Sequence, residues 1–287
     1  MKYIFMLVLL LNACHPPVRR LDQSSHLYHQ GKSLGKIDKR LKEASGLVRS
    51  VNNPGMLWAI NDSGNKNEVF LLNSEAEVVK SFHPPIQNSD WEELVIYTDS
   101  STEKTTLIIG DIGDNNGHKK TKTIYWMEEP HYDQQKDGVL SVDSLRIQLL
   151  DGPRDMEAMF VDPISRNLYL FSKREDSIGL YLLHEPFNKK EASLEKIASL
   201  PFTSIVAADI SSCGKEIIIR DYNNIYYWTR MLQQPIEQVL LSSPVILPCE
   251  NEMQGESVCF DANTNGYFTL SESIFFKRAE LFYYKRK

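Results

Sequence analysis

Acidic residues recur along this chain beside short apolar runs, at intervals of about 45–65 residues. The residues that begin a run are Glu43, Ser45, Asp90, Glu92, Asp155, Glu157 and Glu256, and those that end the following run are Asn61, Asp62, Asp111, Asp114, Lys173, Arg174, Arg220, Asp221 and Glu272. Carboxylate and amide oxygens are ligands that hard cations such as Ca²⁺ prefer. A carboxylate beside a bound cation can also activate water for hydrolysis. The pattern therefore indicates sites at which carboxylate and amide oxygens bind a cation or activate water.

Three interpretations of these residues stay open at this stage. Acidic side chains at strand starts can bond loop N–H groups and hold neighbouring elements together. They can instead bind a divalent cation, for which Asp111, Asp114 and Glu157 are the candidate ligands, although the turn after Asp111 lacks the acidic residues of an EF-hand loop. They can also form a hydrolytic site in which Lys173, Arg174 and Arg220 hold a phosphate or carboxylate.

The residues expected to bind a ligand come from both ends of the runs. They are Asn61, Asp62, Glu92, Asp111, Asp114, Glu157, Lys173, Arg220, Glu256 and Glu272. No nucleophile with a partnering base has a recognisable spacing, so the catalytic residues, and whether the protein is an enzyme, are left open.

The apolar runs that carry these residues are short, rich in β-branched and aromatic residues, and bounded by turn formers, which is typical of β-strands. The first group of runs is Gly46–Val48, Leu57–Asp62, Val69–Leu72 and Val78–Phe82, and the second is Asp90–Tyr97, Thr106–Asn115, Thr123–Met127 and Leu145–Leu149. The third is Glu157–Val161, Leu168–Lys173, Leu180–Leu183 and Leu194–Leu200. The fourth is Val206–Ile210, Glu216–Arg220, Ile225–Trp228 and Gln238–Leu247, and the fifth is Glu256–Phe260, Gly266–Ser271 and Leu281–Tyr284.

This repetition predicts an all-β fold, a single β-propeller with five blades favoured and six as the alternative if the long second group hides a further blade. The last group is one strand short, and Ser33–Leu41 is an unpaired strand candidate before the first group. We expect this N-terminal strand to join the last blade and close the ring. Because strands within a blade are antiparallel, the starts of first strands and the ends of second strands should meet on one acidic face.

The sequence of the N-terminus predicts that the protein is exported and that this segment is not part of the fold. Residues 1–13 combine one Lys with a short apolar run and read as a signal peptide, too short for a membrane span. The sequence Leu11-Asn12-Ala13-Cys14 resembles the bacterial lipobox, which implies cleavage before Cys14 and lipidation of that residue, palmitate included. Residues 14–30 are predicted to be the lipidated Cys and a tether, and residues 31–287 the propeller domain. The predicted location is the cell envelope, anchored to the outer membrane on its periplasmic or surface face, with the membrane contacted only through the lipid.

Composition limits the partners. The net charge is −6 and the Lys and Arg residues are scattered, so no basic stripe is available for nucleic acid. Cys249 and Cys259 could form a disulfide in an exported protein, or could equally be separate thiols.

Several motifs resemble a group of exported bacterial propellers related to the phytase-like and SdiA-regulated propellers. The motifs are Ala44-Ser45-Gly46-Leu47, Leu57–Gly64, Asp90-Trp91-Glu92-Glu93, Gly110–Asn115, Glu128-Glu129-Pro130, Asp155-Met156-Glu157-Ala158 and Gln254-Gly255-Glu256-Ser257, so the likeness covers nearly all of residues 43–287. The resemblance implies that the site is lined by Asp62, Glu92, Asp111, Asp114, Glu157, Glu256 and Glu272. The chain departs from true propeller phytases in lacking their dense acidic metal clusters.

The expected function is therefore that of a lipid-anchored, monomeric binding module that holds a small ligand or an envelope protein on the acidic face. The alternative is a Ca²⁺-dependent, phosphoesterase-like hydrolase that uses the same face. Ca²⁺ is the only cofactor that the sequence suggests.

Overall fold

The computed structural model describes residues 26–287 except 100, 134–139, 186, 188 and 275–276. Within these residues the protein is all-β, with 20 strands and one short helix. The helix, α1, is five residues long, and no helix of the described part is long and apolar enough to cross a membrane. The predicted signal peptide and Cys14 lie outside the described residues.

The strands fall into five groups of four. The first group is β2 (Ala44–Arg49), β3 (Leu57–Asn61), β4 (Val69–Leu72) and β5 (Val78–Phe82), and the second is β6 (Trp91–Thr98), β7 (Thr105–Asp111), β8 (Lys122–Glu128) and β9 (Val142–Leu149). The third is β10 (Met156–Val161), β11 (Leu168–Ser172), β12 (Ile178–Leu183) and β13 (Glu191–Leu200), and the fourth is β14 (Ile205–Ile210), β15 (Glu216–Asp221), β16 (Ile225–Thr229) and β17 (Val245–Leu247). The fifth is β18 (Gly255–Phe260), β19 (Gly266–Ser271), β20 (Glu280–Lys285) and β1 (Lys32–Lys36). The described strands leave no sixth group.

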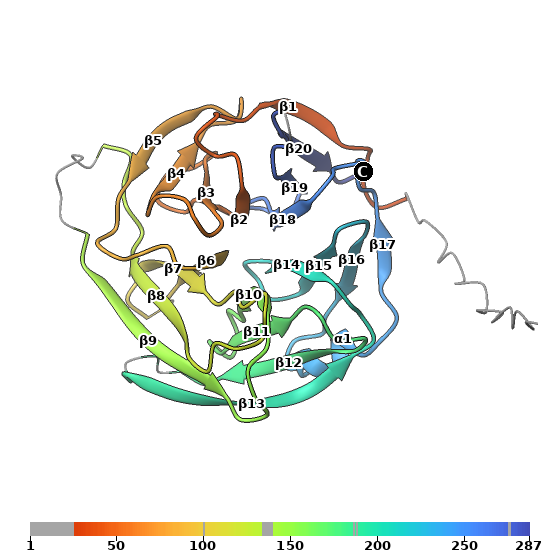
Figure 1. Cartoon of the computed structure of the whole chain (residues 1–287). Coiled ribbons are helices and arrows are strands. Elements are labelled where there is room, and N and C mark those ends of the chain that lie inside the picture. The colour runs from red at the N-terminus through yellow and green to blue at the C-terminus, as the bar shows by residue number, and fades with distance from the viewer. Residues whose placement is uncertain (1–25, 100, 134–139, 186, 188, 275–276) are drawn as a thin grey trace, which may run out of the picture.

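The first strand of each group lies nearest the centre of the molecule, with the other three progressively farther out (Figure 1). These inner strands contact one another in a closed cycle, β2 to β6, β10, β14, β18 and back to β2. They are buried almost throughout, because each packs against two neighbouring inner strands as well as its own sheet partner. The starts of the inner strands are thereby gathered around one centre.

Five hydrophobic clusters fill the space between neighbouring groups. In one of them Phe171 of the third group lies with Ile219 and Trp228 of the fourth. The remaining four clusters join the second group to the third, the fifth to the first, the first to the second and the fourth to the fifth. Each sheet thus buries both faces against its neighbours.

Two pairings connect strands that are distant in sequence. The N-terminal strand β1 pairs antiparallel with β20, as expected, and covers the outer edge of the last group. The start of β13 pairs parallel with β9, which merges the second and third groups into one eight-stranded sheet that the sequence did not predict. β13 can do this because its ten residues extend beyond the strand β12 that it borders.

The predicted strand Gln238–Leu247 is wrong over its first half. Helix α1 (Ile236–Leu240) occupies that stretch, and only β17 is extended. Pro235 stands at the N-cap, where its fixed φ suits a helix start, and Ile236, Val239 and Leu240 share one buried face.

The structure also bears on the two cysteines and on the predicted tether. Cys249 and Cys259 are both free thiols, so they form no disulfide. Tyr28 lies in the predicted tether, yet only 1% of it is exposed because it packs on Tyr227 and Tyr267. The packed part of the chain therefore includes residues before position 31.

Candidate functional site

Each inner strand carries a β-bulge near its start, at the same place in its pairing with the second strand. The extra residue is Glu92 in β6, Glu157 in β10, Val206 in β14 and Glu256 in β18, whereas β2 has Ser45 and Gly46 there. A bulge turns the extra side chain away from the regular alternation of the strand. Three of the bulges therefore deliver a glutamate to the same end of the central region.

The residue that follows the second strand lies opposite each bulge. In four groups it is polar, namely Asp62, Lys173, Tyr222 and Glu272, and in the second group it is Ile112. The strand pairing puts these positions level with the bulges, since the last paired residues are Asn61, Asp111, Ser172, Asp221 and Ser271.

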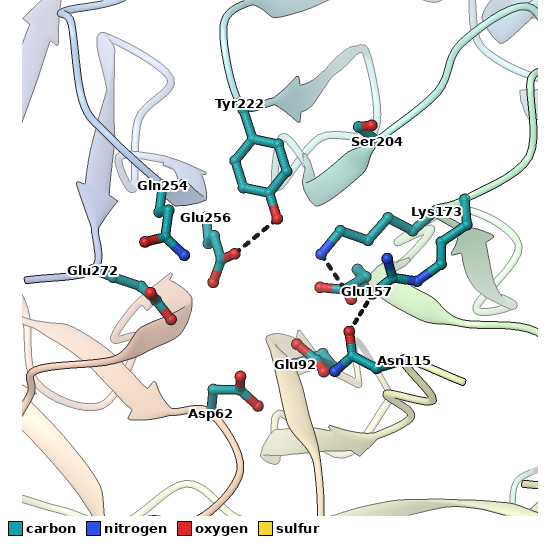
Figure 2. A pocket seen from close by; sticks show the side chains of 11 residues that line it. Asp62, Glu92, Asn115, Glu157, Lys173, Ser204, Tyr222, Gln254, Glu256 and Glu272 are labelled. Atoms are coloured by element: carbon teal, nitrogen blue, oxygen red, sulfur yellow. Dashed lines mark hydrogen bonds and ion pairs between the residues drawn. The ribbon is translucent and has the colours of Figure 1, made fainter. Parts of the chain in front are cut away.

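Together these positions form a pocket of about 380 Å³. Its lining is Asp62, Glu92, Asn115, Glu157, Lys173, Arg174, Ser204, Tyr222, Gln254, Glu256 and Glu272. Figure 2 shows Glu256 and Glu272 on one side, Lys173 on the other, and Asp62 and Glu92 along one edge. The structure thus brings together six of the predicted binding residues: Asp62, Glu92, Glu157, Lys173, Glu256 and Glu272.

The pocket holds five carboxyl groups against two cationic side chains, and these cations already have partners. Lys173 Nζ lies 2.9 Å from Glu157 Oε1. Arg174 bonds to Asp155, outside the pocket lining, and to Asn115. Tyr222 donates a hydrogen bond of 3.1 Å to Glu256. Asp62, Glu92 and Glu272 therefore have no cation paired with them in the pocket.

Burial of like charges raises the pKa of every pocket carboxyl group. Burial is the main cause for Glu92, whose pKa lies well above its usual range, and the neighbouring Glu157 and Asp62 add to it. Burial also raises the pKa of Glu157, and the Lys173 ammonium offsets part of that shift. The same cause raises the pKa of Asp62 and of Glu256, and with Glu256 and Asp62 as neighbours it raises the pKa of Glu272 to about 7. A bound cation would relieve this repulsion.

Replacing Glu272 by Gln should stabilise the ligand-free protein at high pH. The pKa of Glu272 is about 7 in the folded chain against an ordinary 4.5, so the folded state holds more protons between these values and its unfolding free energy falls as pH rises. Because Glu272 is partly exposed, we expect a gain of only about 1 kcal/mol at pH 8 and little change at pH 4. Urea unfolding at both pH values measures this. The exposed Glu195→Gln serves as control, and a Glu272→Gln variant less stable than the parent at pH 8 would contradict the prediction.

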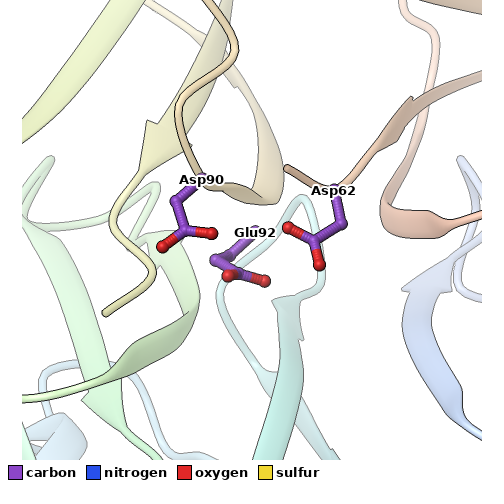
Figure 3. Close-up of side chains that lie close together, drawn as sticks. All are labelled: Asp62, Asp90 and Glu92. Atoms are coloured by element: carbon purple, nitrogen blue, oxygen red, sulfur yellow. The ribbon is translucent and has the colours of Figure 1, made fainter. Parts of the chain in front are cut away.

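One group of carboxylates within the described residues has the spacing of a cation site. Single oxygens of Asp62, Asp90 and Glu92 lie within 4.8 Å of one another, and Figure 3 shows Glu92 between the other two. Asp90 also pairs with Lys119 Nζ, which leaves Asp62 and Glu92 as the members without a cation. Gly113 permits this approach, because a Cβ at that position would collide with the carboxylates of Glu92 and Asp90.

The predicted metal ligands Asp111, Asp114 and Glu157 do not form such a group. Asp114 instead accepts hydrogen bonds from the backbone N–H groups of His118 and Lys119, at 2.9 and 2.8 Å, and so closes its own loop. Asp111 accepts one from the N–H of Ser89. The carboxylates of Asp111 and Asp114 therefore bond backbone N–H groups outside the pocket lining. Of the three predicted metal ligands, only Glu157 lines the pocket.

Two other predicted binding residues also lie outside the pocket lining. Asn61 donates to the carbonyl of Arg40 and accepts from the N–H of Glu43. Arg220 is fully buried, where it donates to the carbonyl of Ser257 and pairs with Glu252 at 2.9 Å. Both side chains connect segments of the fold instead of facing a ligand.

The structural interpretation holds for several acidic residues next to the pocket. Glu93 accepts a hydrogen bond from the N–H of Ala208 in a different sheet, and Asp209 accepts one from the N–H of Phe260. Asp155 accepts one from the N–H of Asp114. These carboxylates tie groups of strands together: the second to the fourth, the fourth to the fifth and the second to the third.

Sequence reasoning did not place Asn115, Ser204, Tyr222 or Gln254 in the site, and it named Arg174 only as a possible anion ligand. All five line the pocket. Tyr222 was recoverable, because it stands at the same position after its strand as Lys173 and Glu272. Ser204 and Gln254 were also recoverable, because each directly precedes an inner strand, at the position that Asp90 and Asp155 hold in their own groups.

No protein-family model matches this chain, and no curated protein matches it.

Proposed function

We propose that the protein is a five-bladed β-propeller whose polar central pocket binds a small cationic ligand. The five groups of strands, the cycle of inner strands and the addition of β1 to the last group support the propeller assignment. With the signal peptide and lipobox, we propose a lipid-anchored module of the cell envelope that acts as a monomer. The pocket would bind a small ligand, or the pocket and its rim would together bind an envelope protein.

The observation that carries the binding proposal is the excess of carboxylates in the pocket. Five acids face two cations that are already paired, and burial raises the pKa of all five acids. A site of this kind gains free energy by accepting positive charge. It has no comparable reason to accept an anion alone.

Cation binding should strengthen as pH rises. At pH 6 the carboxyl groups with raised pKa, such as Glu272, hold protons that a cation must displace, and at pH 8.5 they do so much less. We expect the affinity for Ca²⁺ or for an organic diamine to rise about tenfold across this range.

Calorimetry of the full-length protein in detergent, in buffers of different ionisation enthalpy, would measure both affinity and protons released. Affinity that is independent of pH, with no proton release, would contradict the proposal. Binding of the diamine but not of Ca²⁺ would leave a cation-binding module without a metal site.

A second candidate is a Ca²⁺-dependent phosphoesterase-like hydrolase. Asp62, Asp90 and Glu92 offer oxygens for the cation, and Lys173 and Arg174 line the same pocket, where they would hold a phosphate. Hydrolysis of bis(p-nitrophenyl) phosphate with Ca²⁺ and with chelator tests this directly. Turnover that requires Ca²⁺ and is lost in Asp62→Asn favours the hydrolase, whereas cation binding without turnover favours the module.

A further inference from the structure

The face opposite the pocket, called here the distal face, is formed by the connections between the other ends of the strands. A second cavity of about 80 Å³ opens there among the ends of four inner strands, with Arg49, Thr98, Val161 and Ile210 in its lining. The connections 50–56, 162–167, 211–215 and 261–265 leave the inner strands β2, β10, β14 and β18, and the connection 230–244 joins β16 to β17 on the same side. The distal face is therefore well defined by strand direction.

Exposed apolar side chains are concentrated on the distal face. Among the described residues nine large apolar side chains are exposed, and all but Leu150 and Met253 lie in the connections of this face or in the segment leading into β1. Met231 is 77% exposed, Leu232 60% and Ile164 40%. The central pocket, by contrast, is lined by charged and polar groups.

Three of these side chains lie on one platform, made of two connections that a buried ion pair joins. Arg230 is buried and pairs with Asp162 through two hydrogen bonds, of 2.7 and 3.2 Å, which joins the connection carrying Met231 and Leu232 to the one carrying Ile164. Ile164 also lies against Gly214, where a Cβ would meet its side chain. The loops that carry these apolar side chains are thus joined to one another by a buried ion pair and by packing.

The chain enters the folded part at the same face. Leu27 accepts a hydrogen bond from the N–H of Lys287, and Tyr28 bridges to Arg286, which pairs with Glu216 at the start of β15. Glu216 adjoins the connection 211–215 next to the platform. The stretch from Cys14 to His26 can extend at most roughly 40 Å, at about 3.5 Å per residue. A lipid on Cys14 would hold the distal face close to the bilayer.

We propose that the distal face rests on the lipid bilayer, with Met231, Leu232 and Ile164 entering the interface and the acidic pocket opening away from the membrane. The proposal rests on the lipid anchor of the proposed function and adds a second membrane contact to it. Amphipathic surfaces bind weakly on their own, and a single weak contact becomes effective when an anchor already holds the surface nearby. We choose the bilayer as the partner of the distal face because the chain that carries the lipid anchor enters the fold at this face.

Two exposed methionines on opposite faces give a matched test. Met231→Cys and Met253→Cys, each in a Cys213→Ser background of the full-length protein, are labelled with a small environment-sensitive fluorophore and reconstituted with vesicles of phosphatidylethanolamine and phosphatidylglycerol. Nitroxide-labelled lipid should quench the label at position 231 at least twofold more than the label at 253. Equal quenching, or stronger quenching at 253, would overturn the proposal.

A second measurement separates the face from the anchor. In the Cys14→Ser full-length chain, Met231→Asp with Leu232→Asp should lower partitioning onto the same vesicles about tenfold, and Met253→Asp should leave it unchanged. Unaltered melting temperatures confirm folding. Labelling with radioactive palmitate tests Cys14 separately. If no label is incorporated, the lipid anchor of the proposed function is wrong. If label is incorporated but all variants partition equally, only the membrane contact of the distal face is wrong.

Discussion

Replacing Arg220 by Met is expected to lower the unfolding free energy by about 4 kcal/mol, the largest stability effect that we predict. Arg220 is fully buried, its guanidinium donates to the carbonyl of Ser257, and it pairs with the buried Glu252 at 2.9 Å. The variant would leave the Glu252 carboxylate in the interior without a cation. Gly255 supports the same arrangement, since a Cβ there would collide with the guanidinium.

Urea unfolding compares this variant with Arg146→Met, which removes an arginine that is exposed and pairs with the exposed Glu191. We expect the control to lose less than about 1 kcal/mol, because solvent screens an exposed pair. The double variant Arg220→Met with Glu252→Leu should recover much of the loss, since it removes both buried charges. A loss below about 1 kcal/mol for Arg220→Met would contradict the prediction that the buried pair of Arg220 and Glu252 stabilises the fold.

Replacing Glu92 by Gln together with Asp62 by Asn is expected to weaken cation binding about 100-fold at pH 8. These two carboxylates belong to the closely spaced acidic group, and neither has a cation paired with it in the pocket. Each substitution keeps the size of the side chain and removes one negative charge. The double variant should also be no less stable than the parent without ligand, because the burial that raises the pKa of Glu92 opposes its charge.

Calorimetric titration with Ca²⁺ and with the diamine would measure the change. The matched control is Asp114→Asn, whose carboxylate bonds the N–H groups of its own loop outside the pocket lining. Its affinity should stay within about twofold of the parent. If Asp114→Asn weakened binding as strongly as the double variant, the cation would sit in the loop that the sequence first indicated, and the pocket proposal would be wrong.

The secondary structure was largely predictable because a strand is a local pattern. Alternating apolar residues between turn formers placed most strands within one or two residues, including the five inner strands. The missing strand of the last group predicted its pairing with an N-terminal strand. The exceptions, α1 and the parallel pairing of β13 with β9, depend on packing partners that a local pattern does not contain.

The composition of the site was predictable only in part. Local sequence located acidic residues at the starts of first strands and the ends of second strands, and six of the ten named residues line the pocket. It named Glu92 and not the adjacent, chemically alike Glu93, but only the fold supplies the reason for that difference. The bulge in β6 sends Glu92 into the pocket, while Glu93 bonds the N–H of Ala208 in a neighbouring sheet.

The sequence by itself determined the strands, their grouping in fours and the class of residue at each strand end, because these follow from neighbours along the chain. Only the tertiary structure decided which carboxylates face one another. Asp111 and Asp114 accept hydrogen bonds from backbone N–H groups, and the buried Arg220 pairs with Glu252. Glu92 lies close to Asp62, which belongs to a different sheet. Those outcomes depend on bulges and on contacts between residues far apart in the chain, and such contacts set the burial and charge that give the pocket its chemistry.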